Sequence, residues 1–407
     1  MPPPSPARTI PADAAASAEA WSTRERVVGY ARVFIAIYLV AAVVWVALSS
    51  DMVDENGKPL GYDFITFWAG SFLALAGDAA ASFDMASIFA AERLAVPASE
   101  HVFLWHYPPT FHLIVLPLAL MPYLVAYAVW TAGSFVVYAT VIRRFVPRPE
   151  TLWVLAAFPG AFINAFHGQN GFLTAALFGA ALLQLETRPV LAGLLFGLMS
   201  WKPQLGLLVP IALLCACQWR AFAAAAATTI AVAALSLLVF GMEPWIAFWH
   251  DIPLVGVVLD SGELPWAKIP SLYVALRLLG LTTVPAYVVH AIAALGVLAA
   301  VAHVWRGPAP LRLRGAVLVT GALLVPPYLF DYDLAILAIP IAILAGEGLR
   351  HGWRPFERQV LLAAWLTPLA APGIAEHLGL PLAFAVLLAL FAFSVRRALA
   401  AGEPARN

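Results

Sequence analysis

An acidic residue precedes a short apolar segment early in the chain. The motif is Tyr62-Asp63-Phe64, and the apolar segment runs from Phe64 to Leu75. A carboxylate in this position could act as a general base and accept a proton from a sugar hydroxyl. It could equally cap the helix that follows, a role that Asp fills well. Position alone favours the cap, although both roles can hold at once.

Two short polar breaks interrupt the apolar runs in the middle of the chain. Their sequences are His167-Gly168-Gln169-Asn170 and Trp201-Lys202-Pro203-Gln204, and both are too short for ordinary loops. An ammonium at a helix break suits a phosphate ligand. A lysine that extends its charge to the membrane surface is the alternative for Lys202. The neighbouring Pro203 and Gln204 make a plain anchor less favourable.

Three further places carry polar groups beside apolar segments. His106-Tyr107-Pro108-Pro109 stands at an expected helix start, where proline is favoured and the histidine could bind a ligand. The segment Pro326–Asp333 holds Asp331 and Asp333, of which one is explained as a helix cap. Arg277 is a second candidate anion ligand, and its alternative is an ion pair with Glu263.

Composition identifies the element type that must position these groups. Of the 407 residues, 62% are apolar and only 11% are charged, whereas a soluble domain carries about 25% charged residues. Lipid offers backbone groups no partner, so the spanning segments must be helices. We therefore predict an all-α polytopic membrane protein. A net charge of zero and the lack of a basic stripe exclude nucleic acid as a partner.

Apolar runs of helical length predict about 11 to 13 transmembrane helices. The runs lie near 31–49, 108–142, 151–166, 171–186, 189–201, 204–218, 221–241, 270–303, 314–330, 333–346, 359–371 and 379–395. The runs 108–142 and 270–303 are long enough to be bent or to hold two segments. If each makes one net crossing, 18 of the 23 basic residues fall on one side, which should be cytoplasmic.

This topology predicts cytoplasmic termini and two long loops on the outer side of the cytoplasmic membrane. The first long loop is 50–106, and the second long loop is 241–268. Phe64–Leu75 is too short to span, so we expect an interfacial helix there, followed by a second short helix near Asp84–Leu94. Residues 1–27 are expected to be a disordered tail, 28–398 a single transmembrane domain, and 399–407 a second tail.

Several common catalytic motifs are absent. The sequence has no phosphate-binding glycine loop, zinc-ligand pair or Gly-x-Ser-x-Gly elbow. Their absence argues against an ATP-driven pump, a zinc protease and a serine hydrolase. Asp331-Tyr332-Asp333 has the spelling of a metal-binding Asp-x-Asp but lies between membrane spans, so we expect no metal and no cofactor.

The order of these motifs resembles glycosyltransferase family 87, the polyprenyl-phosphate-sugar-dependent hexosyltransferases of the GT-C fold. The resemblance covers roughly residues 28 to 395. The motifs that carry it are Tyr62-Asp63-Phe64 with Trp68, Gly70 and Gly77, Tyr107-Pro108-Pro109, Gly168-Gln169-Asn170, Ala192–Gly197 leading to Lys202-Pro203-Gln204, and Pro326–Asp333.

The resemblance implies a mechanism and a set of substrates. A hexose, with mannose favoured, would pass with inversion from a polyprenyl-phosphate donor to a hydroxyl of a lipid or glycan acceptor, outside the cytoplasmic membrane. Asp63 would be the base, with Asp51 and Asp54 as rivals that lack the Tyr-Asp-Phe context. The residues expected to bind the donor phosphate are Lys202 and Arg277. Those expected to bind the sugar or the acceptor are Gln169, Asn170, Gln204, His106, Tyr107, His167, Asp331 and Asp333. Some relatives carry a histidine in the late motif, where Asp331 stands here.

Three other functions fit parts of the pattern. A transporter or flippase for a lipid-linked sugar would place its polar groups near the midplane, whereas here they gather towards one face. A membrane ligase that transfers whole lipid-linked glycans would share the donor phosphate site. A non-catalytic scaffold would leave Lys202, Arg277 and the two acidic loops unexplained.

Overall fold

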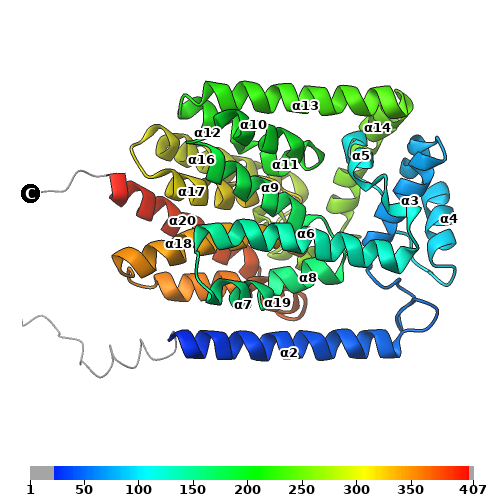
Figure 1. Cartoon of the computed structure of the whole chain (residues 1–407), viewed down its shortest axis with the longest axis horizontal. Helices are drawn as coiled ribbons and strands as arrows, with labels where there is room; N and C mark the ends of the chain where they lie inside the picture. The colour runs from blue at the N-terminus through cyan, green and yellow to red at the C-terminus, as the bar shows by residue number, and fades with distance from the viewer. Residues whose placement is uncertain (1–22, 403–407) are drawn as a thin grey trace, which may run out of the picture.

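The computed structural model describes residues 23–402 and is built from helices, with no β-strand among those residues. The chain is therefore an all-α polytopic membrane protein. Of its helices, α2, α6, α13, α16 and α20, together with the segment Asp331–His351, are long and apolar enough to cross a bilayer. Figure 1 shows α2, α6 and α13 running nearly parallel along the long axis of the molecule.

The helix bounds follow the chain in order. They are α2 Arg24–Leu48, α3 Phe64–Leu75, η1 Ala79–Phe83, α4 Met85–Ala95, η2 Pro109–Phe111, α5 His112–Val115, η3 Leu118–Leu120, α6 Tyr123–Phe145, α7 Glu150–Ala156, α8 Pro159–Phe166, α9 Gly171–Gln184, α10 Pro189–Gly197, η4 Leu198–Trp201, α11 Pro203–Gly206 and α12 Leu208–Cys215. They continue with α13 Trp219–Phe240, α14 Glu243–Ser261, η5 Trp266–Lys268, α15 Leu272–Leu278, α16 Thr283–Arg306, α17 Leu311–Leu324, η6 Asp331–Leu337, α18 Ala338–His351, α19 Glu357–Leu378 and α20 Leu382–Gly402.

Several of the expected spans are shorter helices joined at breaks. Run 108–142 consists of short turns at 109–120 followed by the long α6, and run 270–303 consists of α15 followed by α16. The runs 151–166, 189–201 and 204–218 each divide into two helical pieces. The expected count of 11 to 13 transmembrane helices took each apolar run as at least one continuous span. Proline begins many of the pieces, because its missing N–H costs nothing at the first helical position.

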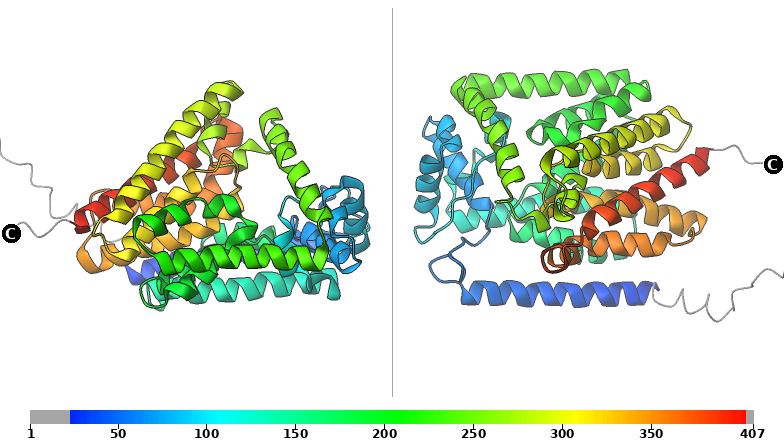
Figure 2. Two further views of the ribbon diagram at one scale, coloured as in Figure 1. Left: turned by 90° about the horizontal axis from the view of Figure 1, so that it is seen from above. Right: turned by 180° about the vertical axis from the view of Figure 1, so that it is seen from behind.

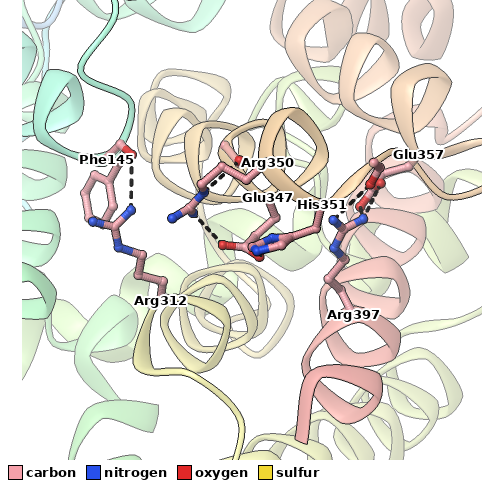
Figure 3. Close-up of polar contacts among 9 residues, drawn as sticks. Phe145, Arg312, Glu347, Arg350, His351, Glu357 and Arg397 are labelled. Carbon is pink, nitrogen blue, oxygen red and sulfur yellow. Dashed lines mark hydrogen bonds and ion pairs between the residues drawn. The ribbon is translucent and has the colours of Figure 1, made fainter. Parts of the chain in front are cut away.

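Most helix ends that carry arginines gather at one end of the molecule; the ends of α4 and α15, with Arg93 and Arg277, are exceptions. Arg24 pairs with Glu150 at 2.5 Å, and Arg312 lies 3.5 Å from the carbonyl of Phe145. Arg397 binds Glu357 at 2.7 Å in the same region (Figure 3). The first turn of α2 and the last turn of α20 both lie at this arginine-bearing end (Figure 1). This arrangement is the one that a single cytoplasmic face would require, and the membrane side itself stays a prediction.

The first long loop forms a compact unit at the opposite end. Helices α3, α4 and α5 lie together there (Figures 1 and 2). Aromatic side chains form its core, with Phe64, Phe67, Trp105 and Phe111 almost fully buried. Helix α3 has the bounds expected from the sequence, and α4 confirms the second short helix. Most of α3 is buried against its neighbours, so this aromatic unit covers the end of the bundle.

The two expected tails lie largely outside the described residues. Within 23–402, α2 begins at Arg24, ahead of the expected boundary at residue 28, and α20 continues to Gly402. The large apolar residues of α2 face outward, and only Ala31 and Tyr38 are buried. Such exposure in a helix of this length fits contact with lipid rather than with water.

Candidate active site

A strained turn positions Asp63. Gly61 and Tyr62 both have positive φ, 90° and 43°, and the left-handed backbone at Tyr62 costs roughly 1–3 kcal/mol. The Tyr62 hydroxyl donates a hydrogen bond to Asp54 at 2.6 Å, and Asp54 also accepts from the backbone N–H groups of Asn56 and Lys58. Asp54, a rival candidate for the base, is thus occupied in holding the turn that presents Asp63.

The side chain of Asp63 does not cap α3. It makes no capping hydrogen bond, so the interpretation that position alone favoured is wrong. The carboxylate instead accepts a hydrogen bond from Nε2 of Gln169 at 3.0 Å and lies 3.4 Å from Nδ1 of His167. Phe64 packs into the aromatic core next to it, and this packing turns Asp63 towards the α8–α9 break.

Close packing brings that break to Asp63. Gly168 has φ 58°, and a Cβ there would lie 2.4 Å from the Cβ of Phe64. A Cβ at Gly171 would lie 2.8 Å from the carbonyl of Tyr332. Glycine is therefore needed at both ends of the break, because any side chain would push away the segments that carry Asp63 and Asp331.

Gln169 links two predicted site residues. Its Oε1 accepts a hydrogen bond from the Tyr107 hydroxyl at 3.0 Å, and its Nε2 donates to Asp63. Burial raises the pKa of Tyr107 well above its ordinary value, so the phenol stays protonated and remains a donor. This donor fixes the orientation of the Gln169 amide, which presents its N–H to the carboxylate.

The environment of Asp63 favours the ionised carboxylate. Burial raises the pKa of Asp63, but the neighbouring imidazole of His167, the Gln169 hydrogen bond and the charge of Lys268 outweigh it. The net effect lowers the pKa below its ordinary value. The Asp63 side chain is 23% exposed, so an ionised oxygen remains reachable from outside.

A buried ion pair joins the second break to the late motif. Lys202 and Asp333 form this pair, and their side chains are 3% and 5% exposed. The second oxygen of Asp333 accepts the N–H of Phe330 at 3.1 Å, and the Tyr332 ring lies 5.4 Å from the Lys202 ammonium. Asp333 therefore acts both as a cap and as the partner of Lys202.

Beside this pair, two buried side chains have unmatched polar atoms. Asp331 Oδ1 has no hydrogen-bond partner among the described residues, and neither does the amide nitrogen or oxygen of Asn170. Asp331 is 4% exposed and Asn170 is fully buried. Buried polar groups normally have partners, so these atoms are available to a ligand or to water.

The remaining predicted residues lie further from this arrangement or make other contacts. His106 pairs with Asp251 of α14 at 2.8 Å, which ties the first long loop to the second. Arg277 donates to Tyr273, to Thr283 and to the carbonyl of Asp260, and forms no ion pair with Glu263 within the described chain. Gln204 is partly exposed at the start of α11.

Three residues of this region escaped sequence reasoning. Asn164 donates to the carbonyl of Gln169 at 3.1 Å and accepts the N–H of Gly171 at 2.8 Å, which fixes the break from behind. Lys268 acts electrostatically on Asp63. Glu92 accepts the N–H of Phe103, and burial raises the pKa of Glu92 to about 8. Two of them left a signal in the sequence: Asn164 is an amide inside the apolar run 151–166, and Lys268 is a basic residue outside the predicted cytoplasmic side.

The sequence model of glycosyltransferase family 87 matches residues 105–327, which is more than half of the chain. The chain belongs to glycosyltransferase family 87. No curated protein and no solved structure matches it. Membership makes the chain a glycosyltransferase, which disfavours the transporter and scaffold alternatives.

The family 87 match divides the candidate site. Tyr107, Gln169 and Lys202 lie inside the matched residues, whereas Asp63 and Asp333 lie outside them. The matched part therefore holds the two polar breaks, and their partners come from the flanking segments. A complete site requires both parts of the chain.

Proposed function

We propose that this glycosyltransferase moves a hexose from a polyprenyl-phosphate donor to a hydroxyl of a lipid or glycan acceptor, with inversion, at the outer face of the cytoplasmic membrane. Mannose is the favoured sugar. The observation that carries the proposal is the Asp63 carboxylate, which is partly exposed, accepts a hydrogen bond from Gln169 and lies 3.4 Å from His167, in surroundings that lower its pKa.

In the proposed reaction, Asp63 accepts the proton of the acceptor hydroxyl. The acceptor oxygen attacks the anomeric carbon from the face opposite the phosphate. The bond from that carbon to the phosphate oxygen breaks, and the polyprenyl phosphate departs with the bonding electrons. A hydrogen bond from Gln169 holds Asp63 in place for this step.

Charge on the departing phosphate needs a fixed cation. Lys202 is the proposed source, because it is buried at the helix break and its partner Asp333 keeps the ammonium in place before the donor binds. A preorganised charge in a site of low dielectric is worth more than one in water. Asn170 and Asp331, with their unmatched atoms, are proposed to bind sugar hydroxyls.

The test compares purified wild type with Asp63→Asn, using polyprenyl-phosphate mannose labelled in the sugar and a panel of lipid acceptors. We expect transfer by the wild type and a loss of about 10²–10⁴-fold in Asp63→Asn. Asp51→Asn is the matched control, because Asp51 is an exposed acid of the same loop. If the wild type transfers no hexose from any polyprenyl-phosphate donor, the proposal is rejected.

A fully active Asp63→Asn would reject the base while leaving the donor class intact. Offering a lipid-linked oligosaccharide in place of the single-sugar donor separates the ligase alternative, since a ligase would transfer the whole glycan.

A further inference from the structure

The cations near the site differ in how far the protein itself neutralises them. Lys202 is bound to Asp333. Arg277 directs its donors to Tyr273, Thr283 and the carbonyl of Asp260, and its guanidinium lies 4.9 Å from the Trp266 ring. Both groups are therefore engaged before any ligand arrives.

Lys268 is different. It ends the η5 turn and is half-buried. Its charge helps to lower the pKa of Asp63 and opposes the burial that raises the pKa of Asp331, and the residues beside it, Trp266 and Ile269, pack with Tyr328 and Phe330 just before Asp331. Its backbone N–H donates to the carbonyl of Pro265 at 2.9 Å, whereas among residues 23–402 its side chain has no hydrogen-bond or ion-pair partner. The ammonium is therefore free to bind an added anion.

The backbone of Lys268 is nevertheless held firmly. Ile269 next to it is 4% exposed, and its cluster includes Trp266, Tyr328 and Phe330. The last two stand just before Asp331, so packing joins the second long loop to the late motif. The Trp266 indole donates to the carbonyl of Leu259 at 2.9 Å. A fixed backbone with a free ammonium is suited to ligand binding, because little backbone order remains to be gained.

A second set of contacts supports this loop. The carboxylate of Asp260, near the end of α14, accepts hydrogen bonds from the hydroxyls of Tyr273 and Tyr287, and the two rings stack at 4.1 Å. Arg277 binds the same group of residues. Helix α14 runs from the end of α13 beside the first long loop (Figure 2) and is joined to it by His106 and Asp251.

The balance of charges at the site indicates a role for the Lys268 ammonium. Asp63 and Asp333 bring two carboxylates to the site, and Lys202 is committed to Asp333. Burial raises the pKa of the third acid, Asp331, which favours its neutral form. A phosphodiester entering beside the Asp63 carboxylate, which has His167 at 3.4 Å as its neighbour, would be repelled unless another cation offset its charge. The repulsion would grow as the leaving phosphate gains charge.

We propose that Lys268 is the second cation of a lipid-phosphate binding site, and that it closes this site from the side of the second long loop. The proposal rests on the proposed function in taking a polyprenyl phosphate as the ligand. Lys202 contacts the phosphate from within the bundle, and Lys268 contacts it from the loop. Arg277 is then a positioning residue that holds the loop around Asp260. Lysine suits the loop position, since its flexible stem lets one point charge follow the phosphate.

The test measures binding of a polyprenyl phosphate and of the polyprenol of the same length to wild type, Lys268→Gln and Lys268→Arg in detergent. We expect Lys268→Gln to weaken binding of the phosphate lipid by about 10- to 100-fold, the effect of losing one charge-assisted hydrogen bond. Polyprenol binding should not change. Lys268→Arg should stay within a few-fold of wild type.

Arg93→Gln is the matched control, because Arg93 is an exposed cation on α4 and should leave binding of both lipids unchanged. Equal phosphate-lipid affinity in wild type and Lys268→Gln overturns the inference. So does an equal loss for polyprenol and its phosphate, which would point to loop packing alone. A wild type that binds polyprenyl phosphate through Lys268 but transfers no hexose supports this inference and rejects the proposed function.

Discussion

Two buried ion pairs occupy opposite ends of the segment Asp331–His351 and differ in how completely they are satisfied. At the arginine-bearing end, Arg397 binds both oxygens of Glu357, at 2.9 and 2.7 Å. Arg397 also donates to the carbonyl of Gly352 at 3.1 Å, and Glu357 accepts the N–H of Arg354 at 3.0 Å. Each charge in this pair has several partners within the chain.

At the other end, the ammonium of Lys202 has a single carboxylate partner, Asp333. Close by, Asp331 and Asn170 hold buried atoms without partners in the described chain. Burying a polar group without a partner costs roughly 1–3 kcal/mol. The difference suggests that the first pair stabilises the fold, whereas the second retains binding capacity for a ligand.

The largest expected effect comes from replacing each pair by apolar side chains. Lys202→Met/Asp333→Leu should lower hexose transfer by about 100-fold or more, since a preorganised charge is lost. Thermal stability should fall only modestly, because a buried pair often exchanges neutrally for apolar residues and one backbone N–H, that of Phe330, loses its acceptor. The control is Arg397→Met/Glu357→Leu, which should keep transfer; its stability should fall, because the carbonyl of Gly352 and the N–H of Arg354 lose their partners. Full transfer by the first double variant would remove the distinction between the pairs.

Removing one partner of the Arg397–Glu357 pair should lower the free energy of unfolding. Arg397→Met leaves the Glu357 carboxylate buried without its partner, and we expect a loss of about 3–5 kcal/mol in the free energy of unfolding. Denaturant titration in detergent micelles measures it. Arg396→Met is the matched control, because that neighbouring side chain is exposed. A loss no greater than the control's would show that the pair contributes little.

The sequence predicted those features that depend on neighbouring residues in the chain, and not those that depend on contacts between distant segments. The bounds of α3 and the N-terminal proline of η2 were predictable, because apolar length and proline position act locally. The segment Asp331–His351 and α6 have the same mean hydropathy, yet 72% of the apolar window is buried in the first and 39% in the second. Hydropathy cannot distinguish lipid from protein as the surroundings of a helix.

The candidate site shows the same limit. Sequence reasoning selected both polar breaks and the late acids, because charges beside membrane spans are costly. It could not assign their partners. Lys202 meets Asp333 across 131 positions, and Gln169 meets Asp63 across 106. The cap expected at Asp63 failed because Gln169 and His167 compete for the carboxylate.

A smaller effect should come from one of the unmatched groups. Asn170→Leu keeps the side-chain shape and removes both unpaired amide atoms, so we expect a gain of about 1–3 kcal/mol in stability. Transfer should fall, because the proposed contacts to the sugar are lost. Thermal unfolding and donor KM measure the two effects. Lower stability would show that water satisfies the amide in the free protein.

The smallest expected effect is a change in pH dependence. His167 lowers the pKa of Asp63, and the base must be ionised to act, so the acidic limb of kcat/KM follows this pKa. His167→Gln should therefore move the limb to higher pH. His303→Gln, on the exposed face at the end of α16, should not move it. A limb that stays in place or moves to lower pH would contradict the assigned role of His167.

The separation of Lys202 and Asp333 along the chain also affects how the protein is made. Asp333 is synthesised 131 residues after Lys202, which at about 5–20 residues per second means a wait of roughly 7–26 seconds. Throughout that interval the lysine has no carboxylate partner. Its position at the η4–α11 break, rather than within a continuous helix, lets a flexible stem reach water at the membrane surface. The break that builds the proposed binding site would thus also allow the nascent chain to insert before the pair can form.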